Sequence, residues 1–177
     1  MSTLVVINGS YRKDGITAKC LEAVSKKIAK QHNMAIVNFF IDDNIKACNN
    51  CGPGNCVIGC HFSDQLQLIA NEIKKADRVL IGSPVYLDFP TPKLLSFLSR
   101  LNCYAESTNR EFFRDKRIHI HANGYCSGTK AVIGILMRAC EMLGFTIEGR
   151  STTEYIEIWK DKKIRGGMNS KDICLLE

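Results

Sequence analysis

Short apolar runs alternate with amphipathic segments along this chain, and that alternation limits the fold more than any other feature. Each run has the length of a buried strand, and the runs lie at 4–7, 35–41, 79–81, 118–122 and 156–159. Between the runs, apolar residues recur three and four positions apart, as on one face of a helix. These faces consist of Leu21, Val24 and Ile28; Leu66, Ile69, Ala70 and Ile73; Leu94, Leu95, Leu98 and Leu101; and Val132, Ile135, Leu136, Ala139 and Leu143.

Strands that alternate with helices favour a parallel sheet, because parallel strands need crossover connections and right-handed crossovers place helices on the faces of the sheet. We therefore expect an α/β three-layer sandwich around a five-stranded parallel sheet. The strand order 2-1-3-4-5 is the natural one for such a sheet. Gly144 stands where a left-handed residue ends the last helix, and an extended pattern resumes at 145–147.

The length of 177 residues is enough for one domain with a sizeable core, so we expect a single domain over residues 1–177. Two stretches depart from the alternation. The stretch at about 42–62 is rich in Cys, Asn and Gly and is interpreted as an insertion. The tail at 166–177 is expected to be poorly ordered at its end.

The net charge is +6, from 24 basic and 18 acidic residues, and the basic residues are spread along the chain. Isolated lysine pairs of this kind predict a solvated surface with no nucleic-acid partner, and no apolar run is long enough to cross a membrane. The first residues lack the features of a signal peptide, so we expect a cytoplasmic protein. Its nine cysteines are then free thiols or metal ligands, because disulfides rarely persist in that compartment.

The segment "NGSYRKDGIT" at 8–17 connects the first expected strand to the first helix. In this class of fold, ligands bind at the carboxyl ends of the strands. Glycines, hydroxyls, an arginine and a helix N-terminus suit a phosphate there. The segment has neither a Gly-Lys-Ser/Thr ending nor a Gly-x-Gly-x-x-Gly pattern, which leaves a terminal monophosphate such as that of FMN. The alternative is a glycine-rich connection with a Thr N-cap.

A second segment, "GSPVYLDFPTPKLLSFLSRL" at 82–101, ends a buried strand and enters a helix. Together the two segments resemble the NAD(P)H-dependent FMN reductase and iron–sulfur flavoprotein families, which have the flavodoxin-like fold. The first motif, Gly-Ser-x-Arg-x-x-Gly-x-Ser/Thr, is matched in full, and Ser-Pro-Val-Tyr is matched at 83–86. The following helix matches loosely, with Ser99 in place of the usual Asp. The resemblance extends over about 3–150, and "DKRIHIHANGYCSGTK" at 115–130 is similar to the family's fourth strand and loop.

The resemblance implies a flavodoxin-like three-layer sandwich that binds FMN. The implied contacts to the phosphate and its loop are Ser10, Arg12, Gly15, Ile16 and Thr17. The implied contacts to the isoalloxazine are Pro84, Val85, Tyr86 and Leu87, with Asn123, Gly124 and Gly128 near the flavin. The alternative interpretation of Tyr86 is a structural one, in which it is a partly buried core aromatic. No residue is assigned a catalytic acid or base role, because the flavin itself carries the redox chemistry.

The stretch "CNNCGPGNCVIGC" places Cys48, Cys51, Cys56 and Cys60 within thirteen residues. Four thiolates this close can hold one metal centre, and a compact run is typical of iron–sulfur ligation. The resembling iron–sulfur flavoproteins carry a Cys-x2-Cys-x2-Cys-x4-7-Cys motif after the second strand, but Gly54 occupies the third position here. Zinc and reduced structural thiols remain alternatives. The other cysteines, interpreted as small buried apolar residues, are Cys20, Cys103, Cys126, Cys140 and Cys174.

The leading hypothesis is an FMN-dependent oxidoreductase that passes electrons from NAD(P)H or a reduced protein to a quinone, a free flavin or a redox partner. With a cluster on the cysteine segment, the role shifts to one-electron transfer. The resemblance also implies a homodimer or homotetramer. One alternative is a flavodoxin-type electron carrier without catalytic activity. Such carriers usually have an acidic docking face, and the net positive charge of this chain argues against that alternative. A further alternative is a flavin- or metal-binding module without turnover.

Overall fold

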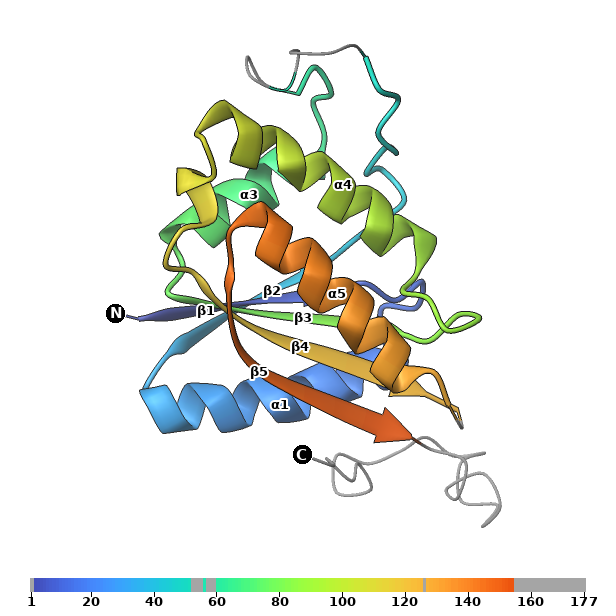
Figure 1. The fold of residues 1–177 in the computed structure, drawn as a ribbon. Coiled ribbons are helices and arrows are strands. Elements are labelled where there is room, and N and C mark those ends of the chain that lie inside the picture. The colour runs from blue at the N-terminus through green and yellow to red at the C-terminus, as the bar shows by residue number, and fades with distance from the viewer. Residues whose placement is uncertain (1, 52–55, 57–59, 126, 155–177) are drawn as a thin grey trace.

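A five-stranded parallel sheet forms the middle layer of the protein (Figure 1). The structure is a computed structural model, and it describes residues 2–51, 56, 60–125 and 127–154. The strands are β1 (Thr3–Asn8), β2 (Ala35–Phe40), β3 (Arg78–Pro84), β4 (Arg117–Gly124) and β5 (Thr146–Glu154). Their order across the sheet is β2-β1-β3-β4-β5, and each neighbouring pair is parallel, which confirms the expected α/β fold and strand order.

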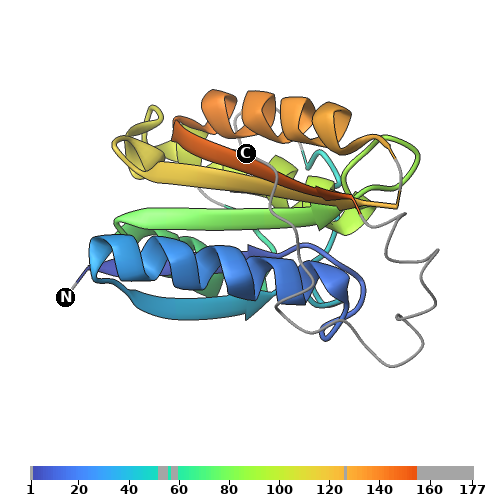
Figure 2. The same cartoon turned by 90° about the horizontal axis from the view of Figure 1, so that it is seen from below.

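Helices cover both faces of the sheet, as Figures 1 and 2 show. Helices α3 (Gln65–Lys75), α4 (Pro92–Ser107) and α5 (Thr129–Leu143) lie on one face, and α1 (Ile16–His32) lies on the other. A short 3-10 helix, η1 (Glu111–Phe113), follows α4. Helices are needed on both faces because alternate residues of a strand point to opposite faces of the sheet, and the apolar side chains on each face have to be covered.

The core is split between the two faces of the sheet. Val5 and Ile7 of β1 pack in the larger apolar cluster with α3, α4 and α5, whereas Leu4 and Val6 pack with α1. The continuous apolar run of the first strand is thereby explained, because a strand covered on both faces buries every side chain. Gly82 of β3 lets α1 approach closely, since a Cβ there would lie 2.6 Å from Leu21 Cδ2.

The helix ends agree with the local signals of the sequence. Asp64 caps α3 by accepting a hydrogen bond from the Leu66 amide at 3.1 Å, and Thr91 caps α4 by accepting one from the Leu94 amide at 3.3 Å. Helix α5 ends at Gly144 with φ 105°, the left-handed conformation that the sequence predicts for this glycine.

The fifth strand of the sheet is Thr146–Glu154, which begins in the extended pattern expected after Gly144. The apolar run 156–159, where the sequence analysis expects the fifth strand, and the tail 166–177 lie outside the described residues. Thr146–Glu154 is largely polar because β5 is an edge strand of the sheet and buries little of its outer side. Among the helices of the described part, none combines the length and the apolar character that a membrane span requires.

Candidate functional site

The loop after β1 folds back on itself at the carboxyl edge of the sheet. The Ser10 amide donates to Asn8 Oδ1 at 3.0 Å, and the Arg12 amide donates to Ser10 Oγ at 3.1 Å. Ser10 and Thr17 are buried, whereas the Arg12 side chain is exposed. The loop therefore has a fixed backbone and a cation at its surface.

The N-terminus of α1 opens onto this loop. Gly15 is the residue before the helix, and no side chain of the described residues caps it. The first turn, which starts at Ile16 and includes Thr17, has no acidic residue. Unpaired amides and the positive end of the helix dipole make such an end suitable for a phosphate. The alternative of a Thr N-cap does not apply, because Thr17 lies inside the helix.

The segment after β3 is tied to the first loop by buried hydroxyls. Thr91 Oγ1 donates to the Gly9 carbonyl at 2.6 Å, and the Thr91 amide donates to Ser83 Oγ at 3.0 Å. Ser83 and Thr91 are both fully buried. These bonds join two parts of the chain that are far apart in the sequence, so the two motifs of the sequence analysis lie side by side.

A tight turn at 86–89 projects from this segment. The amides and carbonyls of Tyr86 and Phe89 exchange two hydrogen bonds of 2.9 Å, and Leu87 and Asp88 both have positive φ. The turn leaves Leu87 95% exposed, and Tyr86 and Phe89 are about half exposed. Tyr86 is therefore not a core aromatic. Exposed apolar side chains at a fixed turn provide a surface for a planar ligand.

The loop after β4 completes the edge. The Val85 amide donates to the Asn123 carbonyl at 2.9 Å. Gly124 and Gly128 pack against the same segment: an added Cβ would lie 3.1 Å from Val85 Cγ2 at Gly124 and 2.2 Å from Asp88 Oδ1 at Gly128. The structure thus brings the three expected groups of site residues together, the groups around Ser10, around Tyr86 and around Asn123.

The donor and acceptor chemistry of this edge fits FMN. The uncapped end of α1 suits a phosphate, and the Tyr86 turn suits an aromatic ring. Asn123 is buried, and its Oδ1 has no hydrogen-bond partner among the described residues. A buried acceptor of this kind normally has a partner, and the ring N–H of a flavin can provide one.

Two residues that the sequence analysis does not single out lie beside the first loop. Tyr11 packs edge-on against Tyr86, with ring centroids 5.9 Å apart. Lys93 Nζ lies 4.9 Å from the centroid of the Tyr11 ring and 4.3 Å from that of Phe40. Burial lowers the pKa of Lys93, and the charges of Asp43 and Asp42 oppose that shift. The position of Tyr11 inside the first motif is the one sequence signal that could have indicated that it lies at the candidate site.

The four cysteines of the expected metal site line one cavity against α4. Cys48 and Cys51 are exposed, and Cys56 and Cys60 are half-buried. The cavity is also lined by Asn49, His61, Phe62, Ser99, Arg100 and Cys103. Among the described residues, no three His, Cys, Asp or Glu side chains lie close enough together to hold a metal ion. The thiol chemistry of the cavity nevertheless fits a thiophilic metal or an iron–sulfur cluster.

Arg100 anchors the cysteine segment to α4. Its buried guanidinium forms an ion pair with buried Asp64, donates from Nη1 to the Lys46 carbonyl at 3.1 Å, and donates from Nη2 to Cys60 Sγ at 3.4 Å. Burial alone would raise the pKa of Asp64. The hydrogen bonds from Arg100 and from the Lys46 and Leu66 amides outweigh that effect, so the pKa of Asp64 is lowered overall.

Cys103 is buried, as are Cys20 and Cys140, which agrees with the interpretation of these three as small buried residues. Cys126 and Cys174 lie outside the described residues. Unlike Cys20 and Cys140, Cys103 faces the cysteine segment: its Sγ lies 3.4 Å from the Cys56 carbonyl. Burial, followed by the charges of Cys56, Cys60 and Cys51, raises the pKa of Cys103 to about 11.

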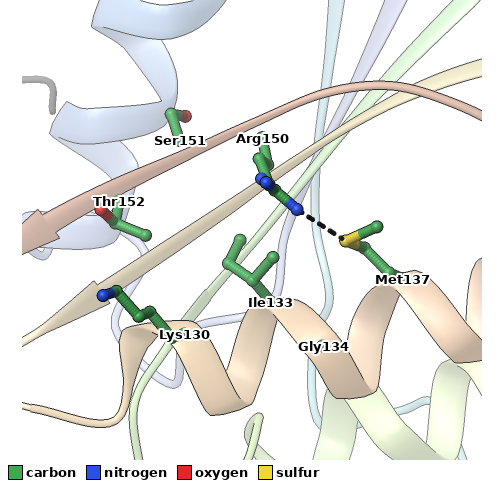
Figure 3. A pocket seen from close by; sticks show the side chains of 7 residues that line it. All are labelled: Lys130, Ile133, Gly134, Met137, Arg150, Ser151 and Thr152. Carbon is green, nitrogen blue, oxygen red and sulfur yellow. Dashed lines mark hydrogen bonds between the residues drawn. The ribbon is translucent and has the colours of Figure 1, made fainter. Parts of the chain in front are cut away.

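A separate cavity lies along the edge strand β5, where α5 runs beside it (Figure 3). Its lining residues are Lys130, Ile133, Gly134, Met137, Arg150, Ser151 and Thr152. Arg150 Nη1 lies 4.0 Å from Met137 Sδ, a weak contact. The residues predicted to bind FMN or metal are absent from this lining, so the cavity is distinct from both candidate sites.

The protein resembles known flavoproteins in sequence. The sequence pattern of the family described as NADPH-dependent FMN reductase matches residues 2–151. An iron-sulfur flavoprotein of Clostridioides difficile strain 630 is 30% identical over 135 residues, which are 73% of this chain and 57% of that protein. An iron-sulfur flavoprotein of Archaeoglobus fulgidus is 29% identical over 98 residues, 55% of this chain and 47% of that protein. The chain thus spans about half the length of these curated relatives.

A solved structure agrees with the fold. The crystal structure of an azoreductase from Bacillus anthracis strain Sterne superposes with a TM-score of 0.65 at 14% sequence identity, over 92% of this chain and 91% of that one. At this identity the superposition supports the architecture alone. The residues of the candidate site therefore have to be judged on their own chemistry.

Proposed function

The chain belongs to the NADPH-dependent FMN reductase family, and from that premise we propose that it is an FMN-dependent oxidoreductase. The observation that carries the proposal is the meeting of three loops at one edge of the sheet. These loops follow β1, β3 and β4, and they are joined by the bonds from Thr91 to Gly9 and from Val85 to Asn123. Such an edge is where ligands bind in open α/β sheets.

Each part of the edge has its own role in the proposal. Ser10, Arg12 and Thr17 hold the FMN phosphate at the start of α1, where Gly15 precedes the helix, Ile16 begins it, and the first amides of the helix have no acceptor within the helix. Pro84, Val85, Tyr86 and Leu87 hold the isoalloxazine. The loop of Asn123, Gly124 and Gly128 supplies an acceptor and room beside the ring. Bound FMN supplies hydride or single-electron transfer, so the chain contributes binding, orientation and exclusion of water.

The proposed donor is NAD(P)H or a reduced protein, and the proposed acceptors are a quinone, a free flavin or a redox protein. A second candidate function is one-electron transfer through an iron–sulfur cluster on the cysteine segment. The shared cavity of Cys48, Cys51, Cys56 and Cys60 favours it, and two relatives are named iron-sulfur flavoproteins. A homodimer or homotetramer is proposed as the functional state, to be checked by light scattering.

The test is binding followed by turnover. The purified chain is titrated with FMN, and then NADH or NADPH oxidation is followed with a benzoquinone, free riboflavin or ferricyanide as acceptor. We expect FMN binding and turnover with at least one donor and acceptor pair. FMN binding without turnover from any donor would reduce the protein to a flavin-binding module, and a folded chain that binds no FMN would refute the proposal.

A further inference from the structure

A buried lysine lies behind the aromatic side chains of the candidate flavin site. Lys93 is the second residue of α4, and its side chain is only 9% exposed. Its Nζ lies 4.9 Å from the centroid of the Tyr11 ring and 4.3 Å from that of the Phe40 ring. The ammonium group therefore lies over two aromatic rings, and such contacts are stronger when they are shielded from water.

The backbone on either side of this contact is fixed. Thr91, which caps α4, donates from Oγ1 to the Gly9 carbonyl at 2.6 Å, so the start of α4 is attached to the loop after β1. Phe40 is the last residue of β2 and lies opposite Asn8 at the end of β1. Lys93 therefore contacts side chains from two other parts of the carboxyl edge, the loop after β1 and the end of β2.

The charge of Lys93 has weak compensation apart from these rings. Among the described residues its ion-pair partner is Asp43, whose Oδ1 lies 4.0 Å from Nζ and whose side chain is 93% exposed. A long contact to a solvated carboxylate contributes little. The ring faces of Tyr11 and Phe40 are therefore the main partners of the ammonium group.

Tyr11 connects Lys93 to the turn at 86–89. The rings of Tyr11 and Tyr86 pack edge-on, with centroids 5.9 Å apart and ring planes at 63° to each other. Both tyrosines are about half exposed, so the contacts with neighbouring side chains have to limit their rotation. Lys93, Tyr11 and Tyr86 thus form a continuous row of contacts that ends at the residue proposed to hold the isoalloxazine.

We propose that Lys93 is a positioning residue for flavin binding, which holds Tyr11 in place so that Tyr11 orients Tyr86 toward the isoalloxazine. The inference rests on the proposed function, because it assigns a role within the proposed flavin site. It concerns the ring system and not the phosphate, which distinguishes the role of Lys93 from that of Arg12. Removing the charge of Lys93 should therefore weaken the binding of a flavin with or without a phosphate.

The first experiment measures the dissociation constants of FMN and riboflavin for the full chain by fluorescence quenching. Lys93→Met removes the charge and should weaken both flavins equally, by about three- to tenfold, which corresponds to one cation–π contact. Lys93→Arg keeps a cation over the rings and should restore both affinities. Lys74→Met is the matched control, because Lys74 Nζ lies 5.3 Å from the centroid of the Phe112 ring, near the edge where β3 and β4 begin. It should leave both affinities unchanged.

A double variant tests whether Lys93 acts through Tyr11. Tyr11→Leu alone should weaken both flavins, and adding Lys93→Met to it should cause no further loss. Additive losses overturn the proposal. A loss in Lys93→Met that is limited to FMN also overturns it, because that result would place Lys93 at the phosphate. Far-UV circular dichroism checks that each variant is folded, and Lys93→Gln takes the place of Lys93→Met if that variant is not.

A second readout needs no flavin. The chain is labelled with fluorotyrosine, and the fluorine NMR signals of its five tyrosines are assigned by replacing each one with phenylalanine. In the flavin-free protein, Lys93→Met should shift the signals of both Tyr11 and Tyr86, whereas Lys74→Met should leave them in place. An unshifted Tyr86 signal in Lys93→Met overturns the proposal. A wild type that binds neither flavin refutes the proposed function and this inference with it, whereas flavin binding that is unchanged by Lys93→Met refutes this inference alone.

Discussion

Arg12 is the residue on which the proposed phosphate site depends most directly at the scale of single side chains. It is exposed beside an uncapped helix N-terminus. We expect Arg12→Ala to weaken FMN binding by about 1 to 3 kcal/mol, because it removes a charge-assisted contact. Riboflavin, which lacks the phosphate, should bind with almost unchanged affinity. Both affinities are measured by fluorescence quenching.

Lys13 provides the matched control for that prediction. It is the next residue of the same loop and is also exposed, so Lys13→Ala removes an equal charge without the proposed contact. Equal losses of FMN affinity in the two variants would mean that the overall positive charge of the loop, and not a specific contact of Arg12, attracts the phosphate. Equal losses of FMN and riboflavin affinity in Arg12→Ala would place its effect outside the phosphate.

His121 carries a pH dependence that originates in its burial. The side chain is fully buried on β4, its Nδ1 lies 2.9 Å from Ser151 Oγ, and the same hydroxyl lies 3.0 Å from His119 Nε2. Burial, followed by the charge of His119, lowers the pKa of His121 from 6.5 to about 3. His121 is therefore neutral in the folded protein at all but acidic pH.

The sign of the effect follows from the two pKa values. Between about pH 6.5 and pH 3 the unfolded chain binds a proton at this position that the folded chain does not, so stability falls as the pH falls. We expect the wild type to lose roughly 1 to 2 kcal/mol more than His121→Gln between pH 7.5 and pH 5.5 in urea titrations. His32→Gln, at an exposed site on α1, should keep the wild-type slope. Parallel slopes for the wild type and His121→Gln would contradict this account.

At the scale of elements, Asp64 joins the start of α3 to α4. Its carboxylate caps α3 through the Leu66 amide and pairs with buried Arg100. Asparagine can still cap a helix but cannot neutralise Arg100. We therefore expect Asp64→Asn to destabilise the fold by about 3 kcal/mol, and Asp64→Ala to cost about 1 kcal/mol more through the lost cap. Urea unfolding of the two variants checks both values; equal stabilities would show that the cap contributes nothing.

We expect the substitution of glycine by alanine to have opposite effects on stability at Gly134 and Gly82. Gly134 lies inside α5, and an added Cβ there meets no atom within 4 Å. We expect Gly134→Ala to raise stability by about 0.5 to 1 kcal/mol, since glycine is a poor helix former. Gly82→Ala should cost about 1 to 3 kcal/mol, because its Cβ would lie 2.6 Å from a Leu21 side chain that is fixed in the core. Thermal unfolding measures both, and a destabilised Gly134→Ala would contradict the first expectation.

At the scale of the whole molecule, ligand binding should couple three loops that are far apart in the chain. We expect FMN to slow amide hydrogen exchange together at 9–17, 84–91 and 123–125, because all three meet at the carboxyl edge. At a hundredfold excess over Kd it should also stabilise the fold by about 2.7 kcal/mol. Residues 146–150, at the start of β5 and away from the carboxyl edge of the sheet, serve as the internal control. Protection limited to one loop would mean that the three do not form one site.

The pattern of apolar residues was enough to predict a parallel sheet and the helices between its strands, because burial on both faces leaves a strong signal. The strand order was predicted from the fold class and not from the apolar pattern. The apolar pattern was not enough for β5, Thr146–Glu154, whose place at the sheet edge needs few apolar residues. The site motifs were recognisable because their residues are contiguous. Arg100 and Cys103 were not, because their partners Asp64 and Cys56 lie 36 and 47 residues away and only the packing of α4 brings them together.

The central position of β1 also affects the order in which the protein can fold. β1 pairs with β2 on one side, but its other neighbour is β3, where Leu4 lies opposite Arg78. That pairing closes a long loop, which costs chain entropy before any contact repays it. On a ribosome, the first strand must therefore wait for the third to emerge before the middle of the sheet can close. Until then, the apolar residues of β1 are exposed on one edge, and this period is when the new chain is most exposed to aggregation.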